Sequence, residues 1–269
     1  MMLPFTKAHA YGNDFVYVDA MALETADPPA AARRLCDRHR GVGADGLIVY
    51  TPTPLGASMK LLNADGSPAE LSGNGLRGLA AILMRAREAQ GTTVNPVVEV
   101  ETAAGVRLLT LESRAGARYV FAAEMGAPAD VHEETIDAGG EHLTVSILSM
   151  GNPQCVVLGP LPDDERFVRL GPALERHRRF PGGANVEFAF IERPDRVRIR
   201  IWERGVGPTE SSGTGSCAAA VAAAAHGGAQ RRVEVLAPGG SQIVEWRPDG
   251  VVLTGWAEII CDGSFNADL

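Results

Sequence analysis

The 269-residue sequence has few of the residues and spacings that build metal centres and disulfide frameworks. It contains four cysteines, none of them in a C-x-x-C pair: Cys36, Cys155, Cys217 and Cys261. Scattered cysteines argue against a zinc site and against a disulfide framework, and no H-E-x-x-H or similar ligand spacing occurs. We therefore expect no metal, and we expect the cysteines to be buried small hydrophobic residues.

Long apolar runs and an excess of basic residues are also missing. No apolar stretch reaches the roughly 18 residues needed to span a membrane, and the N-terminus lacks the sustained apolar run of a signal peptide. The formal net charge is −8, whereas a surface for nucleic acid or anionic lipid needs a basic face that displaces counterions. We expect a cytoplasmic protein that binds neither nucleic acid nor membrane.

A short phrase occurs twice in the chain. Ser-Gly-Asn-Gly at 72–75 opens one stretch of small residues and Ser-Gly-Thr-Gly at 212–215 opens another, and a Gly-Asn pair precedes each copy, at 12–13 and at 151–152. Position 151 lies 139 residues after position 12, and position 212 lies 140 residues after position 72. Matched spacing at two points predicts duplicated halves of about 135 to 140 residues each, with a boundary near 116–128.

Most of the remaining pattern is typical of strands. Segments such as VEFAFIE, VRIRIW and VEVLA alternate or are rich in β-branched residues, and Gly, Pro, Asn or Asp bound them. Helical spacing is restricted to 30–39, 74–89, 163–178 and 214–226. The last of these is almost entirely alanine, so it should be buried inside a sheet. The pattern predicts a sheet-rich α+β fold.

Two known motifs, those of dinucleotide-binding proteins and of serine hydrolases, do not fit the residues that surround them here. The first copy of the phrase also spells G-x-G-x-x-G, but a dinucleotide site needs a strand running directly into the first glycine. Here the polar, turn-like segment ADGSPAELS precedes it. A serine hydrolase is equally disfavoured, because neither Ser72 nor Ser212 lies in G-x-S-x-G.

A Gly-rich loop at a helix N-terminus is an anion site, because its N–H groups lack helical partners and the helix dipole favours negative charge. Two such helices could hold one carboxylate. Five asparagines set among Gly, Asp and Pro can read the ammonium and carboxylate of an amino acid: Asn13, Asn63, Asn74, Asn152 and Asn185. Instead of binding a ligand, each of these asparagines could simply form a turn. In the same way, Glu203-Arg204 could be an ion pair on the surface.

Seven segments, in order and spread over nearly the whole chain, are YGNDFVYVD, GVGADGLIV, NADGSPAELSGNGLRGLAA, MGNPQCVV, NVEFAFI, ERGVGPTESSGTGSCAAAVA and APGG. Together they resemble the diaminopimelate epimerase family. The resemblance implies two pseudo-symmetric α/β domains, each a curled, mostly antiparallel sheet around a central helix, with the active site in the cleft between them. It implies halves of 1–117, completed by 259–269, and of 118–258. It further implies a homodimer that needs no cofactor.

The implied reaction interconverts LL- and meso-2,6-diaminopimelate in lysine and peptidoglycan-precursor biosynthesis. One base removes the Cα proton from one face, and the conjugate acid on the other face returns a proton. Carried over position by position, the catalytic residues are Ser72, Ser212 and Glu203. The residues that would bind substrate are Asn13, Asn63, Gly73, Asn74, Asn152, Asn185, Glu203, Arg204, Gly213 and Thr214.

The chain departs from the family pattern where the chemistry takes place. Ser72 and Ser212 stand at the positions of the family's two catalytic cysteines, Gln154 stands at that of a histidine, and Pro208 at that of a glutamate. A serine hydroxyl is a weaker acid than a thiol and is normally activated by an adjacent base. Two alternatives stay open: a racemase or dehydratase acting on another amino acid, and a non-catalytic protein that keeps the ligand site.

Overall fold

The computed structural model describes residues 2–23, 27–69, 72–91, 95–103 and 105–266. The chain forms two compact units, Met1–Ala123 with Gly255–Leu269, and Glu124–Thr254. Two strands contain a boundary between the units, namely β8 (Arg118–Gly126) and β17 (Gly250–Asn266). That the units descend from duplicated halves, 1–117 with 259–269 and 118–258, stays a prediction.

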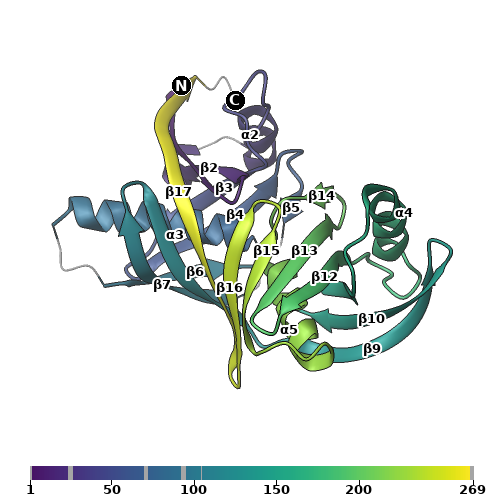
Figure 1. Cartoon of the computed structure of the whole chain (residues 1–269). Coiled ribbons are helices and arrows are strands. Elements are labelled where there is room, and N and C mark those ends of the chain that lie inside the picture. Colours follow the sequence, from purple (N-terminus) through teal and green to yellow (C-terminus); the bar gives the residue numbers. More distant parts are fainter. Residues whose placement is uncertain (1, 24–26, 70–71, 92–94, 104, 267–269) are drawn as a thin grey trace. The chain divides into compact units, whose positions relative to one another are not determined.

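The first unit combines a mixed sheet with helices on both of its faces (Figure 1). Its elements before β8 are β1 (Met2–Ala10), β2 (Asn13–Asp19), α1 (Ala20–Leu23), α2 (Pro28–Leu35), β3 (Gly46–Pro52), β4 (Gly56–Asn63), β5 (Pro68–Ala69), α3 (Gly73–Ala89), β6 (Val97–Thr102) and β7 (Gly105–Ala115).

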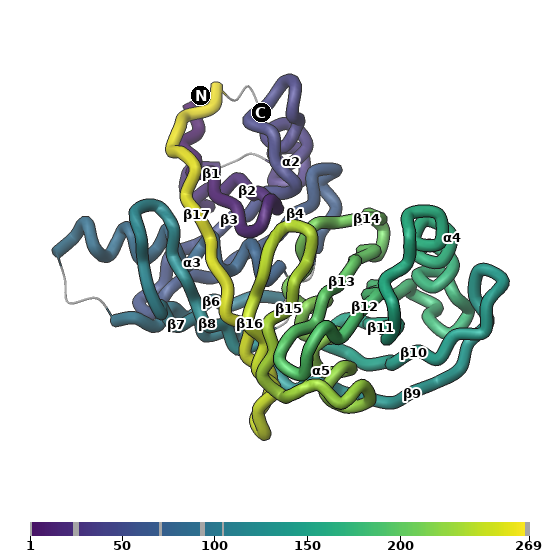
Figure 2. The backbone as a smooth tube through the Cα atoms, in the orientation of Figure 1, coloured from purple at the N-terminus to yellow at the C-terminus, as the bar shows by residue number. Residues whose placement is uncertain are grey.

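Strand pairing in the first unit is antiparallel except at two places. β2 runs parallel to β3, and β4 runs parallel to β6. The pairs β1–β2, β3–β4, β4–β5, β6–β7 and β7–β8 are antiparallel. The C-terminal part of β17 lies antiparallel to β1, with Met2 opposite Asn266 and His9 opposite Glu258 (Figure 2).

The second unit repeats this order of pairings. Its elements are β9 (Ala129–Ala138), β10 (Glu141–Ser149), β11 (Pro153–Leu158), α4 (Asp164–Glu175), β12 (Asn185–Arg193), β13 (Arg196–Glu203), β14 (Gly207–Thr209), α5 (Gly213–His226), β15 (Arg232–Ala237), β16 (Gly240–Arg247) and the start of β17. β11–β12 and β13–β15 are parallel. The other pairs, from β9–β10 to β16–β17, are antiparallel.

One helix occupies the inner face of each sheet. α3 packs against β1, β2 and β6, and its residues 73–82 are all buried. α5 packs against β9 to β13, β15 and β16, and its residues 213–223 are all buried. The predicted burial of the alanine-rich helix is therefore confirmed.

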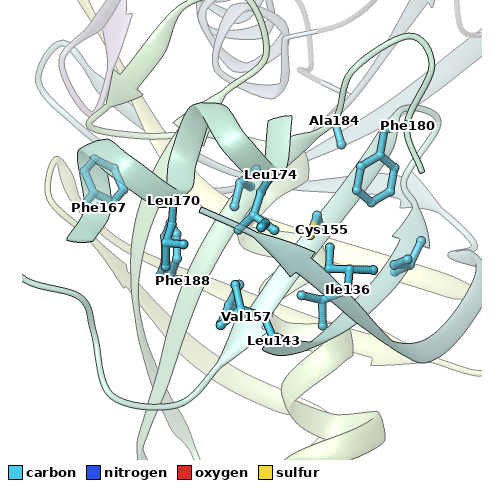
Figure 3. Close-up of a cluster of buried hydrophobic side chains, with 14 residues drawn as sticks. Ile136, Leu143, Cys155, Val157, Phe167, Leu170, Leu174, Phe180, Ala184 and Phe188 are labelled. Atoms are coloured by element: carbon cyan, nitrogen blue, oxygen red, sulfur yellow. The ribbon is translucent and has the colours of Figure 1, made fainter. Parts of the chain in front are cut away.

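The outer faces carry separate hydrophobic cores. In the second unit α4 places Phe167, Leu170 and Leu174 against Phe188 of β12 and Ile136 of β9 (Figure 3). In the first unit α1, α2 and the loop after α2 cover the corresponding face of β1 to β4. The predicted class is confirmed: an α+β fold of two units that share a topology, each a curled, mostly antiparallel sheet around a central helix.

Two predicted helices are longer than the real ones. The predicted helix 30–39 is observed as α2, which ends at Leu35. Asp37 then accepts hydrogen bonds from the backbone N–H groups of His39 and Arg40, at 2.8 and 2.9 Å, and so stabilises a turn in place of a further helical turn. The predicted helix 163–178 is observed as α4, which begins after an Asp163 N-cap and ends at Glu175.

Candidate active site

The first copy of the repeated phrase forms the start of α3. Ser72 is the N-cap residue, with the extended backbone expected there (φ −128°, ψ 115°). Its Oγ accepts a hydrogen bond of 3.0 Å from the backbone N–H of Gly75. Oγ therefore lies at the positive end of the helix dipole, beside N–H groups that have no helical partner. The predicted helix start at residue 74 is one residue late.

Gly78 is required by close packing, and no nucleotide is needed to explain it. A Cβ atom at Gly78 would lie 2.0 Å from the hydroxyl oxygen of Tyr17. That hydroxyl is fixed because it donates a 3.0 Å hydrogen bond to the carbonyl of Gly75. The third glycine of the G-x-G-x-x-G pattern thus makes room for a tyrosine of β2.

Asn13 and Asn74 meet beside the start of α3. The Asn74 amide donates to Oδ1 of Asn13 at 3.2 Å, and the Asn13 amide donates to Oδ2 of Asp45 at 2.7 Å. The guanidinium of the fully buried Arg77 in turn donates to Oδ1 of Asn74. Both amides are therefore held in one orientation, and Asp45 is a supporting residue that the sequence gave no reason to select.

A charged cluster stands behind Asn13. Asp14 pairs with Lys7 at 2.9 Å and with Arg38 at 2.8 Å, and Arg38 also pairs with Asp45 at 2.8 Å. Burial alone would raise the pKa of Asp14, but hydrogen bonds from Arg38 and Lys7 outweigh burial and lower it. The Asp45 carboxylate that orients Asn13 is thus part of a connected ionic network.

Asn63 is placed differently. It is exposed, and its amide donates to the Ser67 hydroxyl at 2.9 Å inside the turn between β4 and β5. The backbone N–H of Asn63 also bonds the Ser67 carbonyl at 2.9 Å. The simple turn that the sequence left open as an alternative is therefore present at Asn63, and a role in binding substrate stays a prediction.

The second copy of the phrase forms the start of α5 with the same geometry. Ser212 is the N-cap (φ −138°, ψ 127°), is 9% exposed, and its Oγ accepts a 3.1 Å hydrogen bond from the N–H of Gly215. Cys217 lies further along the helix and is fully buried. No thiol takes the place of Ser212 at the helix terminus.

Polar side chains also gather at the start of α5. The Asn152 amide lies 3.4 Å from the Thr214 hydroxyl, and the Gln154 amide lies 2.6 Å from Oδ1 of Asn152 and 3.2 and 3.3 Å from the two carboxyl oxygens of Glu187. Gln154 is fully buried, as is Glu187 on the neighbouring strand β12. Burial raises the pKa of Glu187 well above its usual range, and the nearby Glu203 carboxylate raises it further.

Glu203 is the last residue of β13, and Arg204 begins the turn that follows it. The buried Asn185 accepts a 2.9 Å hydrogen bond from the backbone N–H of Arg204 through Oδ1. The buried Glu175 accepts from the N–H of Gly205 at 2.9 Å and from the Trp202 indole at 2.8 Å. Hydrogen bonds to two buried side chains therefore hold the backbone of the turn that begins at Arg204. A simple ion pair on the surface would not need this support.

The structure thus brings the predicted residues together in two groups, one in each unit. Ser72, Gly73, Asn13 and Asn74 surround the start of α3, whereas Ser212, Gly213, Thr214 and Asn152 surround the start of α5. The sequence missed the supporting residues Asp45, Glu175 and Glu187. For Glu187 the sequence gives no signal, because its burial depends on α5, which comes from a distant part of the chain.

One prediction about the cysteines is wrong. Cys36, Cys155 and Cys217 are buried, but Cys261 is exposed, because it lies in a run of three exposed residues, 260–262, where the pairing of β17 with β1 is irregular. Burial raises the pKa of Cys36 to about 12.

In the part of the chain that the structure describes, no helix is long and apolar enough to cross a membrane.

The fold is that of the epimerases and racemases. A solved structure of a predicted epimerase from Pseudomonas aeruginosa superposes with a TM-score of 0.75 at 18% identity, and the match covers 99% of this chain and all of that one. A probable proline racemase from Agrobacterium radiobacter gives a TM-score of 0.72 at 17% identity, over 99% of this chain and 93% of that one.

Sequence comparison narrows the class further. The family model described as diaminopimelate epimerase matches residues 5–131 and 146–260. The diaminopimelate epimerase of Desulforudis audaxviator is 42% identical over 281 residues, covering 98% of this chain and 99% of that protein. That of Pelotomaculum thermopropionicum is 38% identical over 97% of this chain and 98% of that protein. The chain belongs to the diaminopimelate epimerase family, a family of isomerases.

Proposed function

We propose that the chain interconverts LL- and meso-2,6-diaminopimelate by proton transfer at Cα, without a cofactor. The observation that carries the proposal is the duplicated helix start, where Ser72 and Ser212 each present an Oγ atom held by a glycine N–H. Family membership over the whole chain supports the substrate. The proposal requires both units to contact one substrate molecule.

In this proposal Ser72 and Ser212 exchange protons with opposite faces of the Cα atom. Each Oγ lies where the helix dipole and a glycine N–H favour negative charge, an effect of up to about 2 kcal/mol. The helix terminus therefore favours the deprotonated form of each hydroxyl by no more than this amount. Even with this stabilisation a serine hydroxyl remains a much weaker acid than a cysteine thiol. Proton transfer should therefore be slow and should limit the turnover rate.

Substrate binding follows from the groups around each serine. The backbone N–H groups at the two helix starts, at Gly73 and Asn74 and at Gly213 and Thr214, are suited to a carboxylate. The guanidinium of Arg204 can pair with a carboxylate in a bidentate manner. Asn13, Asn63, Asn152 and Asn185 supply further amides for the ammonium and carboxylate groups, and Glu203 would poise the neighbouring Ser212.

We also propose a cytoplasmic homodimer, as the family resemblance implies. Light scattering after size-exclusion chromatography would measure the mass directly. A particle of twice the 28.4 kDa chain mass is the expected result.

The function is tested by incubating the purified protein with LL-diaminopimelate and quantifying the meso isomer by chiral chromatography. Slow conversion in both directions is expected, and conversion should be lost in a Ser72→Ala, Ser212→Ala double variant. A Ser72→Cys, Ser212→Cys variant should be faster than the natural chain by a factor of about 10² or more, because a thiol is a much better acid at neutral pH. Conversion only of another amino acid, or tight binding without conversion, would contradict the proposal.

A further inference from the structure

Glu187 is a buried acid for which the proposed proton transfers give no role. It lies on β12 between Val186 and Phe188, whose side chains belong to the core on the α4 side. Its own side chain points the other way, towards α5, and is fully buried. A buried carboxyl group costs several kcal/mol in its charged form unless it is paired.

The start of α5 is shaped around this carboxyl group. A Cβ atom at Gly215 would lie 2.5 Å from Oε1 of Glu187 and 3.1 Å from Oγ of Ser212. Both oxygens are measured from the same point, so Oε1 of Glu187 and Oγ of Ser212 can be no further apart than the sum of these two distances. Glycine at 215 is therefore needed for the acid to approach the turn that Ser212 caps, so the phrase itself accommodates Glu187.

In the part of the chain that the structure describes, no cation neutralises Glu187. Among the described residues, none forms an ion pair with it, and the charged group acting on it is the Glu203 carboxylate on β13. The Cys155 thiol, on β11, belongs to the core on the opposite face of the sheet. α5 contributes only its N-terminus, whose dipole favours an anion by about 2 kcal/mol at most. Burial and Glu203 both raise the pKa of Glu187 and so favour the neutral acid.

A neutral Glu187 completes a chain of hydrogen bonds. The side-chain oxygen of Gln154 lies 3.2 and 3.3 Å from the two carboxyl oxygens of Glu187, so a protonated carboxyl can donate its O–H to that oxygen. The Gln154 N–H₂ then donates to Asn152 at 2.6 Å, and the Asn152 N–H₂ donates to Thr214 at 3.4 Å. An ionised Glu187 could only accept, which would reverse both amides.

We propose that Glu187 is a positioning residue: its buried, protonated carboxyl group sets the direction of the hydrogen bonds through Gln154, so that Asn152 presents its N–H₂ group at the start of α5. This inference rests on the proposed function for the identity of the ligand. With the chain reversed, Asn152 would present its carbonyl oxygen to a substrate carboxylate, and the two acceptors would repel each other.

Two variants separate this role from a purely structural one. Glu187→Gln keeps a donor, because its N–H₂ group replaces the carboxyl O–H, and KM should stay within about threefold of the natural value. Glu187→Leu removes the donor, and KM for diaminopimelate should rise about 10-fold or more, the loss of about one hydrogen bond to a charged group. The effect on kcat should be smaller. If Glu187→Gln loses as much kcat as Glu187→Leu does, the proposal is overturned, because Glu187 itself would then transfer a proton.

A matched control lies at the other end of α5. Ser146 is 2% exposed and its hydroxyl contacts Nδ1 of His226 at 2.8 Å, outside the Glu187 chain. Ser146→Ala removes one buried hydrogen bond from the same unit and should leave KM unchanged. If Ser146→Ala raises KM as much as Glu187→Leu does, a general loss of packing explains the effect and the proposal fails.

Two readouts need no turnover and separate this proposal from the proposed function. Infrared difference spectra between the natural chain and Glu187→Gln should contain the carbonyl band of a protonated carboxylic acid at neutral pH. In ¹⁵N NMR spectra of the ligand-free protein, the Asn152 amide signals, assigned by their loss in Asn152→Asp, should move in Glu187→Leu and stay in place in Glu187→Gln. Absence of the band, or unmoved Asn152 signals, would overturn the role of Glu187 even in an active epimerase.

Discussion

The starts of α3 and α5 share a backbone geometry, but the buried ionisable side chain that accompanies each of them is different. In both, a serine caps the helix and accepts the N–H of the glycine three residues later. At α3 the buried group is Arg77, a cation that bonds Asn74 and lies over the ring of Tyr11. At α5 it is Glu187, an acid without a cation partner among the described residues.

This difference shows how one duplicated device can serve two roles. The buried cation of α3, Arg77, favours a deprotonated oxygen in its surroundings, whereas the neutral Glu187 carboxyl group beside α5 supplies no such charge. The proposed two-base inversion requires one base and one acid in the resting enzyme, and unequal surroundings of the two serines suit that requirement. The repeated topology supplies equal geometry, and the buried side chains supply the asymmetry.

The largest expected effect comes from removing either hydroxyl. Ser72→Ala and Ser212→Ala should each lower kcat by about 10² to 10⁴, the usual contribution of one acid or base. Steady-state kinetics in both directions would measure this. Comparable losses at both positions would show that both helix starts take part in the reaction.

Each of these variants also loses an N-cap, which typically costs about 1 kcal/mol of stability. Asp163→Ala is the control, because Asp163 caps α4 through a 2.8 Å bond to the N–H of Arg166 and lies outside the site. Its stability should fall by a similar amount while kcat stays unchanged. Full activity in Ser72→Ala would mean that only the α5 start is catalytic.

The next effect tests the packing of the two helices. Gly78→Ala should destabilise the protein by about 1–3 kcal/mol, because the new methyl group meets the Tyr17 hydroxyl that is fixed on Gly75. The corresponding residue of α5 is already Ala218, and Ala218→Gly should cost only about 0.5–1 kcal/mol. Denaturant titration would give both values. A smaller loss for Gly78→Ala than for Ala218→Gly would contradict the close approach of Tyr17.

The smallest effect compares acid sensitivity in the two units. The pKa of Asp14 is lowered by Arg38 and Lys7 against burial, and that of Glu141 is lowered to about 2 by Arg166 and Arg169. Carboxylates with depressed pKa values stabilise the fold above their unfolded pKa and lose this contribution as the pH falls.

Between about pH 4.5 and pH 2, Glu141→Gln and Asp14→Asn should each flatten the fall in unfolding free energy. The exposed Glu141 pairs should matter less, because salt and solvent screen them. Denaturation at a series of pH values measures this. A larger effect for Glu141→Gln would reverse the comparison.

Local pattern predicted much of the fold. The alanine-rich stretch identified α5 as a buried helix, and the doubled phrase located both caps to within one residue. The pattern could not predict where α2 ends, because the competing Asp37 turn depends on a single side chain. Nor could it find Glu187, Glu175 or Asp45, since their roles come from residues that are distant in sequence and meet only in the folded units.

The central claim is that Ser72 and Ser212 exchange protons with Cα from opposite faces. It is tested most directly by incubating the natural chain with LL-diaminopimelate in heavy water and following both isomers by NMR and mass spectrometry from the first turnovers. The account predicts that the newly formed meso isomer carries one deuterium at the inverted Cα, while the remaining LL substrate carries none. Deuterium that enters the LL substrate as fast as the product, or no deuterium in either isomer, would contradict it.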